Sequence, residues 1–337
     1  MVVLIKPLLF MRKKFFLVML ALMMCGANAL AQSPLMATLS HDGKISTFYG
    51  SSAFQQAHAA AANGDVITLS SGSFAGENIT KAVTIRGAGM EVDTVHAIEP
   101  TVLTGNFNIN IADSVTNILT MEGIFHNQEI NVANLKNAMF LKCRFNKFSY
   151  VFSGSSVMKD LNFINCRIAN SFLGNGNGSA SFINTVAKGI TSSSNSGHYS
   201  LINSIVFGSD VKNSEFKNCI LVEISSRTDN SYYNNLFIID DTNALNSIPN
   251  TTNVRVPKND ERIANLLGDY SDSNPYTLTE EANNILKGTD GTEVGIYGGS
   301  IPYDATPTNP RITKFEVAQK TTADGKLSVD IEVNGGE

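Results

Sequence analysis

The sequence predicts an all-β protein in which short parallel strands stack into a β-helix, with a helix covering the first coil and a β-hairpin at the C-terminal end. Three observations lead to this prediction: a repeat of about twenty residues, columns of similar residues within it, and few charged side chains. The copies of the repeat are centred on small or turn-forming residues, which are Gly87, Gly105, Gly123, Cys143, Cys166, Thr185, Ser204, Cys219 and Asn235. Their neighbours are β-branched and aromatic, which favours strands over paired helices.

Two columns of the repeat have a clear structural meaning. The position three residues before the small residue is apolar, and its aromatic members are Phe140, Phe163, Phe182 and Phe216. The position just before the small residue holds Lys142 and then asparagines, which are Asn165, Asn184, Asn203 and Asn218. Because Asn tolerates the left-handed conformation, we expect an inward stack of phenylalanines and a row of turns whose amides pair along the stack.

Three cysteines, Cys143, Cys166 and Cys219, fall in the column of small residues. We interpret them as small buried hydrophobic residues. Cys143 and Cys166 would lie on neighbouring coils, close enough for a disulfide bridge. A metal site is disfavoured because no histidine shares the column.

The N-terminal region is typical of an export signal that occupies residues 1–31 and starts at Met11. A basic stretch is followed by an apolar stretch too short to span a bilayer, and then by small residues at Ala29 and Ala31. We expect cleavage after Ala31, with cleavage after Ala29 or lipidation of Cys25 as alternatives. The remaining chain has no second apolar run, so we expect a secreted, periplasmic or cell-surface protein without a transmembrane segment.

The composition indicates a large core and a weakly charged surface. The chain has 337 residues, of which 43% are hydrophobic and 16% are charged, and its formal net charge is −5. Sequence-independent binding of nucleic acids relies on clustered Lys and Arg, so this acidic balance argues against a nucleic-acid partner.

The order of elements follows from the repeat and its flanks. A β-helix is expected over residues 32–303, followed by a linker and a hairpin over residues 304–337. A helix is predicted over residues 52–62, because the segment is Ala-rich and Ser51 or Ser52 can act as its N-cap. Such a helix would cover the open edge of the first coil. The hairpin is too small to fold alone, and we expect it to pack on the last coil.

Three motifs carry a resemblance to a known fold family. They are residues 63–69 (NGDVITL), residues 81–89 (KAVTIRGAG) and residues 288–299 (GTDGTEVGIYGG). The first two resemble the opening of right-handed parallel β-helix proteins of the pectin-lyase-like superfamily, and the third resembles the closing motif of exported bacterial members. The chain is similar in particular to uncharacterised surface proteins of Bacteroidetes-like bacteria. The resemblance implies a right-handed β-helix but no single function, because this fold carries lyases, hydrolases, adhesins and spacers.

The enzymes of that superfamily imply two catalytic hypotheses. Polygalacturonase-like members carry acidic groups on adjacent coils, and this chain has only Asp240 and Asp241 as such a pair. Pectate-lyase-like members need a Ca²⁺ site of several carboxylates with a basic residue, and the coils here are short of acids. We interpret Asp240 and Asp241 as a solvated turn, with a Ca²⁺ site or catalytic carboxylates as alternatives. The histidines His58, His96 and His126 are isolated, which favours structural or exposed positions.

A second constellation consists of Arg144 and Arg167, which occupy the same position on successive coils, with Lys142 nearby. Stacked guanidinium groups about 5 Å apart repel each other unless an anion lies between them. Either the arginines extend into solvent or meet Glu122 or Asp160, or they bind a uronate, sulfate or phosphate group.

Together these patterns favour an exported, non-catalytic, monomeric protein that binds carbohydrate or acts as an adhesin. The alternatives are a polysaccharide lyase or glycoside hydrolase of the same fold, and a purely structural surface element. A glycan or another cell-surface polymer is the expected partner, and no cofactor is expected apart from the Ca²⁺ considered at Asp240 and Asp241.

Overall fold

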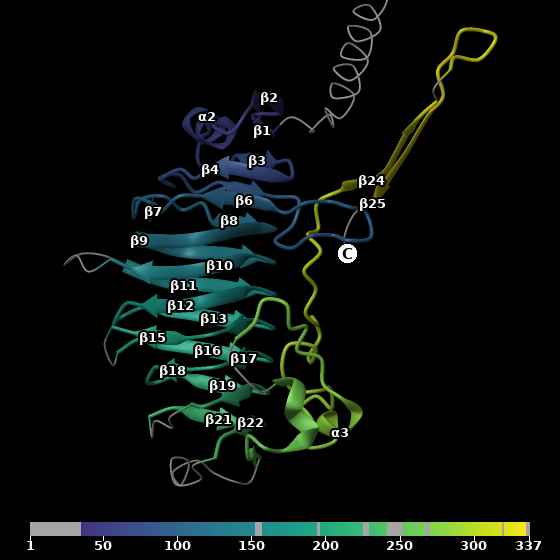
Figure 1. Cartoon of the computed structure of the whole chain (residues 1–337). Helices are drawn as coiled ribbons and strands as arrows, with labels where there is room; N and C mark the ends of the chain where they lie inside the picture. Colours follow the sequence, from purple (N-terminus) through teal and green to yellow (C-terminus); the bar gives the residue numbers. More distant parts are fainter. Residues whose placement is uncertain are drawn as a thin grey trace, which may run out of the picture. The chain divides into compact units, whose positions relative to one another are not determined.

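The structure is a computed structural model that describes residues 35–151, 157–193, 196–224, 229–240, 252–266, 270–318 and 320–334. The predicted export signal, with Met11, Cys25 and both cleavage positions, lies outside these residues. The described chain forms a parallel β-solenoid, as Figure 1 shows. The all-β fold predicted from the repeat is therefore confirmed.

Three ladders of parallel strands make up the coils, and the first ladder contains the phenylalanine column. Each strand of this ladder pairs in parallel with the next one along the stack. Its members are β3 (Val66–Leu69), β5 (Thr84–Arg86), β8 (Leu119–Glu122), the end of β9 (Ile124–Leu141), β11 (Val157–Ile164), β13 (Ser179–Ile183), β16 (His198–Ile202), β19 (Glu215–Lys217) and β21 (Ser231–Tyr233).

The second and third ladders complete each coil. The second contains β4 (Gly72–Ala75), β6 (Thr101–Thr104), the start of β9, β10 (Arg144–Tyr150), β12 (Arg167–Gly174), β14 (Val186–Ala187), β17 (Ile205–Val206), β20 (Ile220–Val222), β22 (Leu236–Ile238) and β23 (Val254–Val256). The third contains β7 (Phe107–Asn110), the middle of β9, the ends of β10 and β12, β15 (Ile190–Ser192) and β18 (Ser209–Asp210). The long strands β9, β10 and β12 belong to more than one ladder, because they continue around a corner of the coil.

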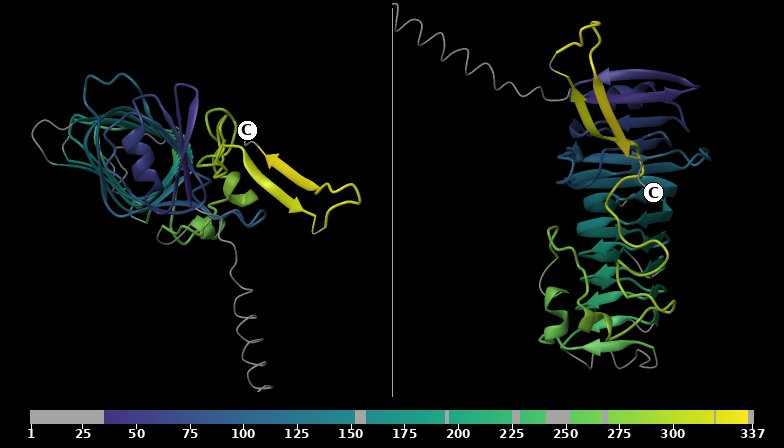
Figure 2. Two further views of the ribbon diagram at one scale, coloured as in Figure 1. Left: turned by 90° about the horizontal axis from the view of Figure 1, so that it is seen from above. Right: turned by 90° about the vertical axis from the view of Figure 1, so that its right-hand side faces the viewer.

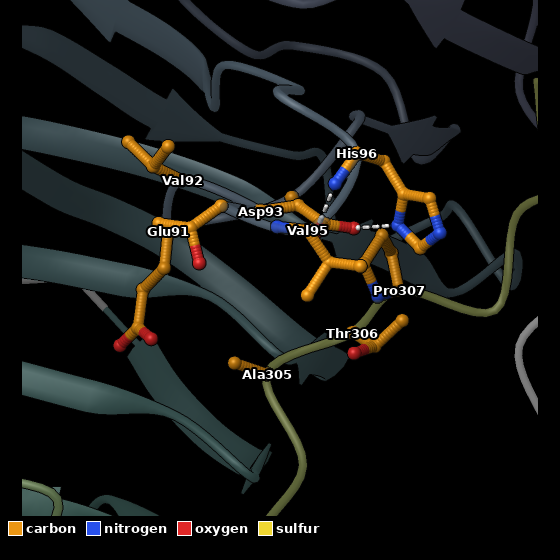
Figure 3. A pocket seen from close by; sticks show the side chains of 10 residues that line it. Glu91, Val92, Asp93, Val95, His96, Ala305, Thr306 and Pro307 are labelled. Carbon is orange, nitrogen blue, oxygen red and sulfur yellow. Dashed lines mark hydrogen bonds and ion pairs between the residues drawn. The ribbon is translucent and has the colours of Figure 1, made fainter. Parts of the chain in front are cut away.

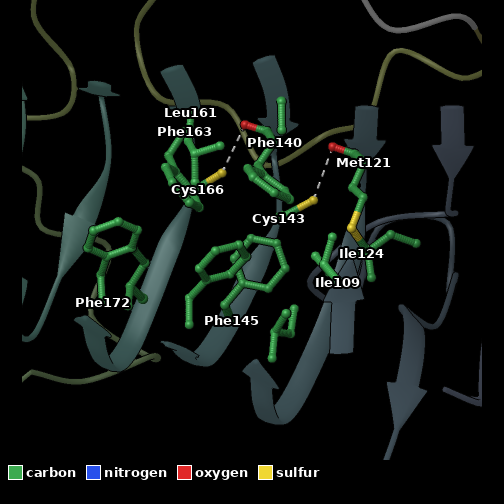
Figure 4. Close-up of a cluster of buried hydrophobic side chains, with 14 of the residues drawn as sticks. Ile109, Met121, Ile124, Phe140, Cys143, Phe145, Leu161, Phe163, Cys166 and Phe172 are labelled. Carbon is green, nitrogen blue, oxygen red and sulfur yellow. Dashed lines mark hydrogen bonds between the residues drawn. The ribbon is translucent and has the colours of Figure 1, made fainter. Parts of the chain in front are cut away.

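The phenylalanine column lies inside the solenoid, as predicted. Phe163 stacks between two neighbours, with ring centroids 4.7 Å from Phe140 and 5.0 Å from Phe182. All aromatic members of the column are fully buried, namely Phe140, Phe163, Phe182 and Phe216. Figure 4 shows Cys143 and Cys166 beside this stack. Aromatic burial of this extent is a main source of the stability of the coils.

The turn column adopts the predicted left-handed conformation. Its φ angles are 51° for Lys142, 54° for Asn165, 47° for Asn184, 47° for Asn203 and 55° for Asn218. The upstream part of the repeat needs a correction. Glu122 pairs with Leu141, so Gly123 belongs to the turn column, whereas Gly105 follows β6 at the next corner and does not align with Cys143. Gly87 and Gly123 are one coil apart, and this coil is long because it contains an insertion at residues 88–100. The regular spacing of the three glycines therefore does not mean that they occupy the same position on successive coils.

Helix α2 (Ala53–Ala60) covers the first coil and corresponds to the helix predicted over residues 52–62. Ser52 occupies the N-cap position, but its side chain forms no capping hydrogen bond with the helix backbone and accepts from the Gln56 side chain at 2.9 Å. The Ala53, Phe54 and Ala57 side chains of the helix are fully buried. Seen from above in Figure 2, the helix lies across the end of the solenoid. Before it, β1 (Met36–His41) and β2 (Lys44–Tyr49) form an antiparallel hairpin, and β1 also pairs with β3. These elements shield the apolar interior at the N-terminal end.

The C-terminal part contains the predicted hairpin and two short helices that the sequence analysis does not predict. The hairpin consists of β24 (Arg311–Val317) and β25 (Val329–Asn334), and the helices are η2 (Glu261–Leu266) and α3 (Glu280–Asn283). The Thr279 hydroxyl caps α3 by accepting a hydrogen bond from the Ala282 N–H at 3.1 Å. A helix of four residues is too short for an apolar period to reveal it.

The expectation that the hairpin packs on the last coil is wrong. Residues 288–309, called the return segment below, run back along the solenoid toward its N-terminal end, as Figure 2 shows. Early in this segment the Gly295 N–H donates to the Asn218 carbonyl at 2.8 Å, and at its end the Asn309 side chain donates to the Gly87 carbonyl at 3.1 Å. The hairpin follows Asn309 directly, so it leaves the solenoid beside the early coils.

Candidate functional site

The return segment is held by the asparagines of the turn column. Asn184 is fully buried, and its amide donates to the carbonyls of Ile296 at 2.7 Å and Gly298 at 2.8 Å. The same relationship recurs along the corner: Asn218 accepts from the Thr289 N–H at 3.0 Å, and Asn165 donates to the Pro302 carbonyl at 3.4 Å. The amides therefore bind the return segment. The expectation that they pair with one another along the stack is not met at these positions.

A glycine allows the closest approach of the return segment to this corner. Gly299 has a φ of 78°, and a side chain there would collide with the amide of Asn203. Glycine is the residue that adopts this conformation without strain and leaves space for the amide. The motif at residues 288–299 thus has a structural role in docking the chain onto the turn column.

The outer face of the second ladder is covered by the same C-terminal chain. Its outward residues on successive coils are buried, and they are Val186, Ile205, Ile220, Leu236 and Val256. Ile263, Tyr276, Val294 and Ile296 pack on them from the C-terminal side. The sequence contains a signal for this covering that the repeat analysis misses, because strands such as Ile220–Val222 and Leu236–Ile238 are apolar without alternation.

Arg144 and Arg167 lie directly opposite each other on β10 and β12, as their shared position in the repeat predicts. Arg144 forms an ion pair with Asp272 and stacks on the Phe125 ring, 4.3 Å from its centroid. Lys142 donates to the Asp304 carboxylate at 3.0 Å and to the Thr306 carbonyl at 2.6 Å. These cations bind the C-terminal chain, and Asp272 provides the anion that the stacked arginines need.

Arg167 is the most deeply buried of the three cations, with its side chain only 4% exposed. Its Nε lies 2.8 Å from the Tyr303 hydroxyl and 3.0 Å from Glu91 Oε1. One terminal nitrogen donates to the carbonyls of Asp272 and Asn274, each at 3.1 Å. The binding of an external anion by Arg144, Arg167 and Lys142 stays a prediction, and the structure gives each of these side chains an intramolecular partner.

The remaining expectations for charged residues meet different outcomes. The Glu122 carboxylate accepts from the Thr308 N–H at 2.6 Å, and its Oε2 lies 3.9 Å from Arg86 Nε. Glu122 is therefore bound by Thr308 and Arg86 and not by Arg144 or Arg167. Asp240 is exposed and accepts from the Lys258 N–H at 2.9 Å, whereas Asp241 lies outside the described residues. In the part of the chain that the structure describes, no three His, Cys, Asp or Glu side chains gather as a metal site.

The thiols of Cys143, Cys166 and Cys219 are buried and unreactive. All are free and fully buried, as interpreted from the sequence, so the bridge considered between Cys143 and Cys166 is not formed. Burial raises the pKa of the Cys166 and Cys219 thiols to about 12, and burial also raises the pKa of Cys143. Thiols that remain protonated are poor nucleophiles and poor metal ligands, so these residues serve packing.

A pocket of about 410 Å³ lies where the insertion at residues 88–100 meets the return segment. Figure 3 shows Glu91, Asp93 and His96 on one side and residues 305–307 on the other. Loops inserted into a rigid scaffold are a common place for binding sites, and this volume is within the range of small-ligand pockets. The site is not predictable from the sequence, because residues 88–100 carry no recognisable motif and meet the return segment only after folding.

The polar groups of the pocket are ordered by short hydrogen bonds. His96 Nδ1 lies 2.9 Å from Asp93 Oδ2, and the N–H groups of Val95 and His96 donate to Asp93 Oδ1 at 3.0 and 3.1 Å. The hydrogen bond from His96 lowers the pKa of Asp93 to about 2. Val92 and Val95 are 50% and 84% exposed. The pocket thus combines two carboxylates, an imidazole and exposed aliphatic side chains.

No protein-family model, curated protein or solved structure matches the chain. Over the described residues, no helix is long and apolar enough to cross a membrane. The fold and the site together define the class of the protein as a parallel β-solenoid with one covered ladder and a pocket at an inserted loop.

Proposed function

We propose that the protein is an exported, non-catalytic β-solenoid that binds carbohydrate in the pocket beside residues 88–100. The single observation that carries this proposal is the composition of that pocket. Carboxylates such as Glu91 and Asp93 accept hydrogen bonds from hydroxyl groups, and the exposed Val92 and Val95 can contact the apolar face of a sugar ring.

The charge of the pocket bears on the kind of saccharide. Glu91 and Asp93 place two carboxylates at the pocket, where Glu91 is paired with Arg167 and Asp93 with His96. The described residues that line the pocket include no Lys or Arg that could bind a uronate or sulfate group. A neutral or amino sugar is therefore favoured here, whereas the sequence-based hypothesis of an anionic glycan depends on arginines that bind the C-terminal chain.

The geometry also supports a non-catalytic role for the pocket. A glycosidase needs one carboxyl group that holds a proton near neutral pH and a second that is ionised. Asp93 is held in its ionised form, since its pKa is about 2, and Glu91 forms an ion pair with Arg167. A lyase or hydrolase remains the alternative proposal, and a purely structural surface element is a second one.

The test is binding and turnover on the same preparation. Isothermal titration with neutral, amino and uronic oligosaccharides should give the strongest binding to a neutral or amino sugar, and reducing-end and unsaturated-uronate assays should stay at background with or without Ca²⁺. Val95→Ser should weaken binding by about fivefold to tenfold, because an apolar contact is lost. The matched control is Ile118→Ser, which changes another exposed aliphatic residue that does not line the pocket. Equal effects of the two changes, or any turnover, would contradict the proposal.

Export is proposed from residues 1–31 alone. Expression of the full chain in a bacterial host and sequencing of the mature N-terminus should yield Gln32 as the first residue, because Ala31 fits the small position before a cleavage site. A mature protein that begins at a lipid-modified Cys25 would support the alternative of a surface lipoprotein.

A further inference from the structure

Lys142 is the exception in the turn column. The next four coils have asparagine at the same turn, namely Asn165, Asn184, Asn203 and Asn218, and all five residues have a positive φ. Asn adopts this left-handed conformation more readily than Lys, because its short polar side chain bonds to nearby backbone groups. The turn alone therefore does not explain why a lysine stands here.

The end of the Lys142 side chain holds one wall of the pocket. Its Nζ donates to the Thr306 carbonyl at 2.6 Å and to Asp304 Oδ2 at 3.0 Å, and the side chain is only 10% exposed. The other oxygen of Asp304 accepts from the Thr306 N–H at 2.9 Å. Both backbone polar groups of Thr306, a residue that lines the pocket, are therefore fixed by Lys142 and its partner.

The residues after Thr306 are fixed on the preceding coil. The Thr308 N–H donates to the Glu122 carboxylate at 2.6 Å, and Pro307 packs against the turn at Gly123. A side chain at Gly123 would lie 3.0 Å from Cβ of Pro307, so the glycine leaves the space that Pro307 occupies. The pocket wall of residues 305–307 is thus attached at two points, through Lys142 and through Glu122.

The opposite wall of the pocket is attached to the next coil. Glu91 of the inserted loop pairs with Arg167, which also binds the Tyr303 hydroxyl. Replacing Arg167 would therefore disturb both walls at once. The contacts of Lys142 described above are all with the return segment, so its replacement acts on one wall only.

We propose that Lys142 is a positioning residue of the pocket, which keeps the wall of residues 305–307 in place before a ligand arrives. A wall that is already ordered loses less conformational freedom on binding, so the affinity for a saccharide is higher than with a loose segment. The effect on affinity rests on the proposed binding of carbohydrate. The attachment of the wall is a property of the protein without ligand.

Hydrogen–deuterium exchange of the full chain without ligand tests the attachment. Lys142→Asn is the informative change, because it introduces the residue of the neighbouring coils and keeps the turn but removes the ammonium group. Peptides that contain residues 304–309 should exchange at least about tenfold faster, whereas peptides from β11 and β13 should exchange as in the wild type. If Lys142 only forms the turn, exchange of residues 304–309 stays unchanged in Lys142→Asn, and this result would overturn the proposal.

Two further variants separate the position of Lys142 from its charge. Lys142→Arg keeps a long cationic donor and should exchange as slowly as the wild type. Lys136→Asn removes another lysine, which pairs with Asp113 at the surface, and should leave residues 304–309 unchanged. Equally fast exchange in Lys136→Asn and Lys142→Asn would point to a general effect of charge and contradict a specific attachment.

The second experiment measures the consequence for the pocket by isothermal titration with cello-oligosaccharides and chitosan oligosaccharides, as neutral and amino sugars. A saccharide that binds the wild type should bind Lys142→Asn at least about fivefold more weakly and Lys136→Asn equally well. Equal affinity of Lys142→Asn and the wild type would overturn the positioning role. If neither kind of saccharide binds the wild type, the proposed function fails, and the exchange experiment alone decides whether Lys142 positions this wall.

Discussion

Arg167 on β12 binds Glu91 of the inserted loop, with 3.0 Å between Nε and Oε1. The same guanidinium group reaches the Tyr303 hydroxyl in the return segment and the carbonyls of Asp272 and Asn274. One side chain therefore joins the coils, the pocket loop and the C-terminal chain. Replacing Arg167 should therefore weaken the attachment of both the pocket loop and the C-terminal chain to the coils.

We expect Arg167→Met to lower the free energy of unfolding by about 2 to 4 kcal/mol, because several buried acceptors lose their donor. Urea denaturation gives this value, and limited proteolysis should cut residues 88–100 and the return segment faster. The control Arg262→Met removes a half-exposed arginine that pairs with Asp260, and it should cost less than about 1 kcal/mol. Equal costs for the two changes would show that the buried arginine has no special role.

The turn asparagine Asn184 allows its backbone and side-chain contributions to be separated. Asn184→Gly keeps the left-handed turn but loses both hydrogen bonds to the return segment, so we expect a loss of about 1 to 3 kcal/mol. Asn184→Ala should cost about 1 kcal/mol more, because alanine is strained at a φ of 47°. Urea denaturation of both variants measures the difference. A glycine variant as stable as the wild type would show that the hydrogen bonds contribute nothing.

The contrast between the interior and the return segment shows what a sequence of this kind can predict. The inward position of Phe163 and the left-handed turn at Asn184 follow from residue type and repeat spacing, since these are local properties of each coil. The partner of Asn184 does not follow, because Ile296 and Gly298 are more than a hundred residues away. Local patterns thus predict the coils but not which segment of the chain covers them.

The arginine column illustrates the same limit. The sequence places Arg144 and Arg167 side by side but does not reveal Asp272, which approaches only after the chain has turned back. The pocket is missed for the same reason, since Glu91 and Pro307 meet through tertiary structure. A stretch of apolar residues without alternation, as at Ile220–Val222, is the signal that would have indicated a covered outer face.

The stacked phenylalanines should be the most sensitive part of the core. Phe163→Ala should lower the free energy of unfolding by about 3 to 5 kcal/mol, because the adjacent rings of Phe140 and Phe182 cannot close the cavity. Tyr233→Ala is the control in the same ladder. Because the Tyr233 ring is half-exposed, its removal should lower the free energy of unfolding by less than about 1 kcal/mol. Chemical denaturation checks both variants, and an unchanged midpoint for Phe163→Ala would place that ring in solvent.

The buried thiols should be unreactive until the protein unfolds. Because burial raises the pKa of Cys166 and Cys219 to about 12, almost no thiolate is present at neutral pH. Alkylation followed by mass spectrometry should find Cys143, Cys166 and Cys219 unmodified in the native state and fully modified in denaturant. Rapid native labelling of Cys166 would mean that the coils open locally far more often than a packed core allows.

His58 should make the N-terminal cap sensitive to mild acid. Burial, and to a lesser extent the nearby charge of Lys81, lowers the pKa of His58 to about 4, whereas an unfolded chain has a value of about 6.5. The unfolded state therefore binds the proton first as the pH falls. The stabilising contribution is fully present above about pH 6.5 and is lost progressively between about pH 6.5 and 4, by up to about 3 kcal/mol.

His58→Leu removes this titration, so its stability should depend less on pH than that of the wild type across the same window. Urea denaturation at a series of pH values measures the difference. His126 also has a pKa lowered by burial, so part of the pH dependence should persist in the single variant and fall further in the double variant with His126→Leu. Parallel stability curves for His58→Leu and the wild type from pH 8 to 4 would mean that His58 is protonated as readily in the folded protein as in the unfolded chain.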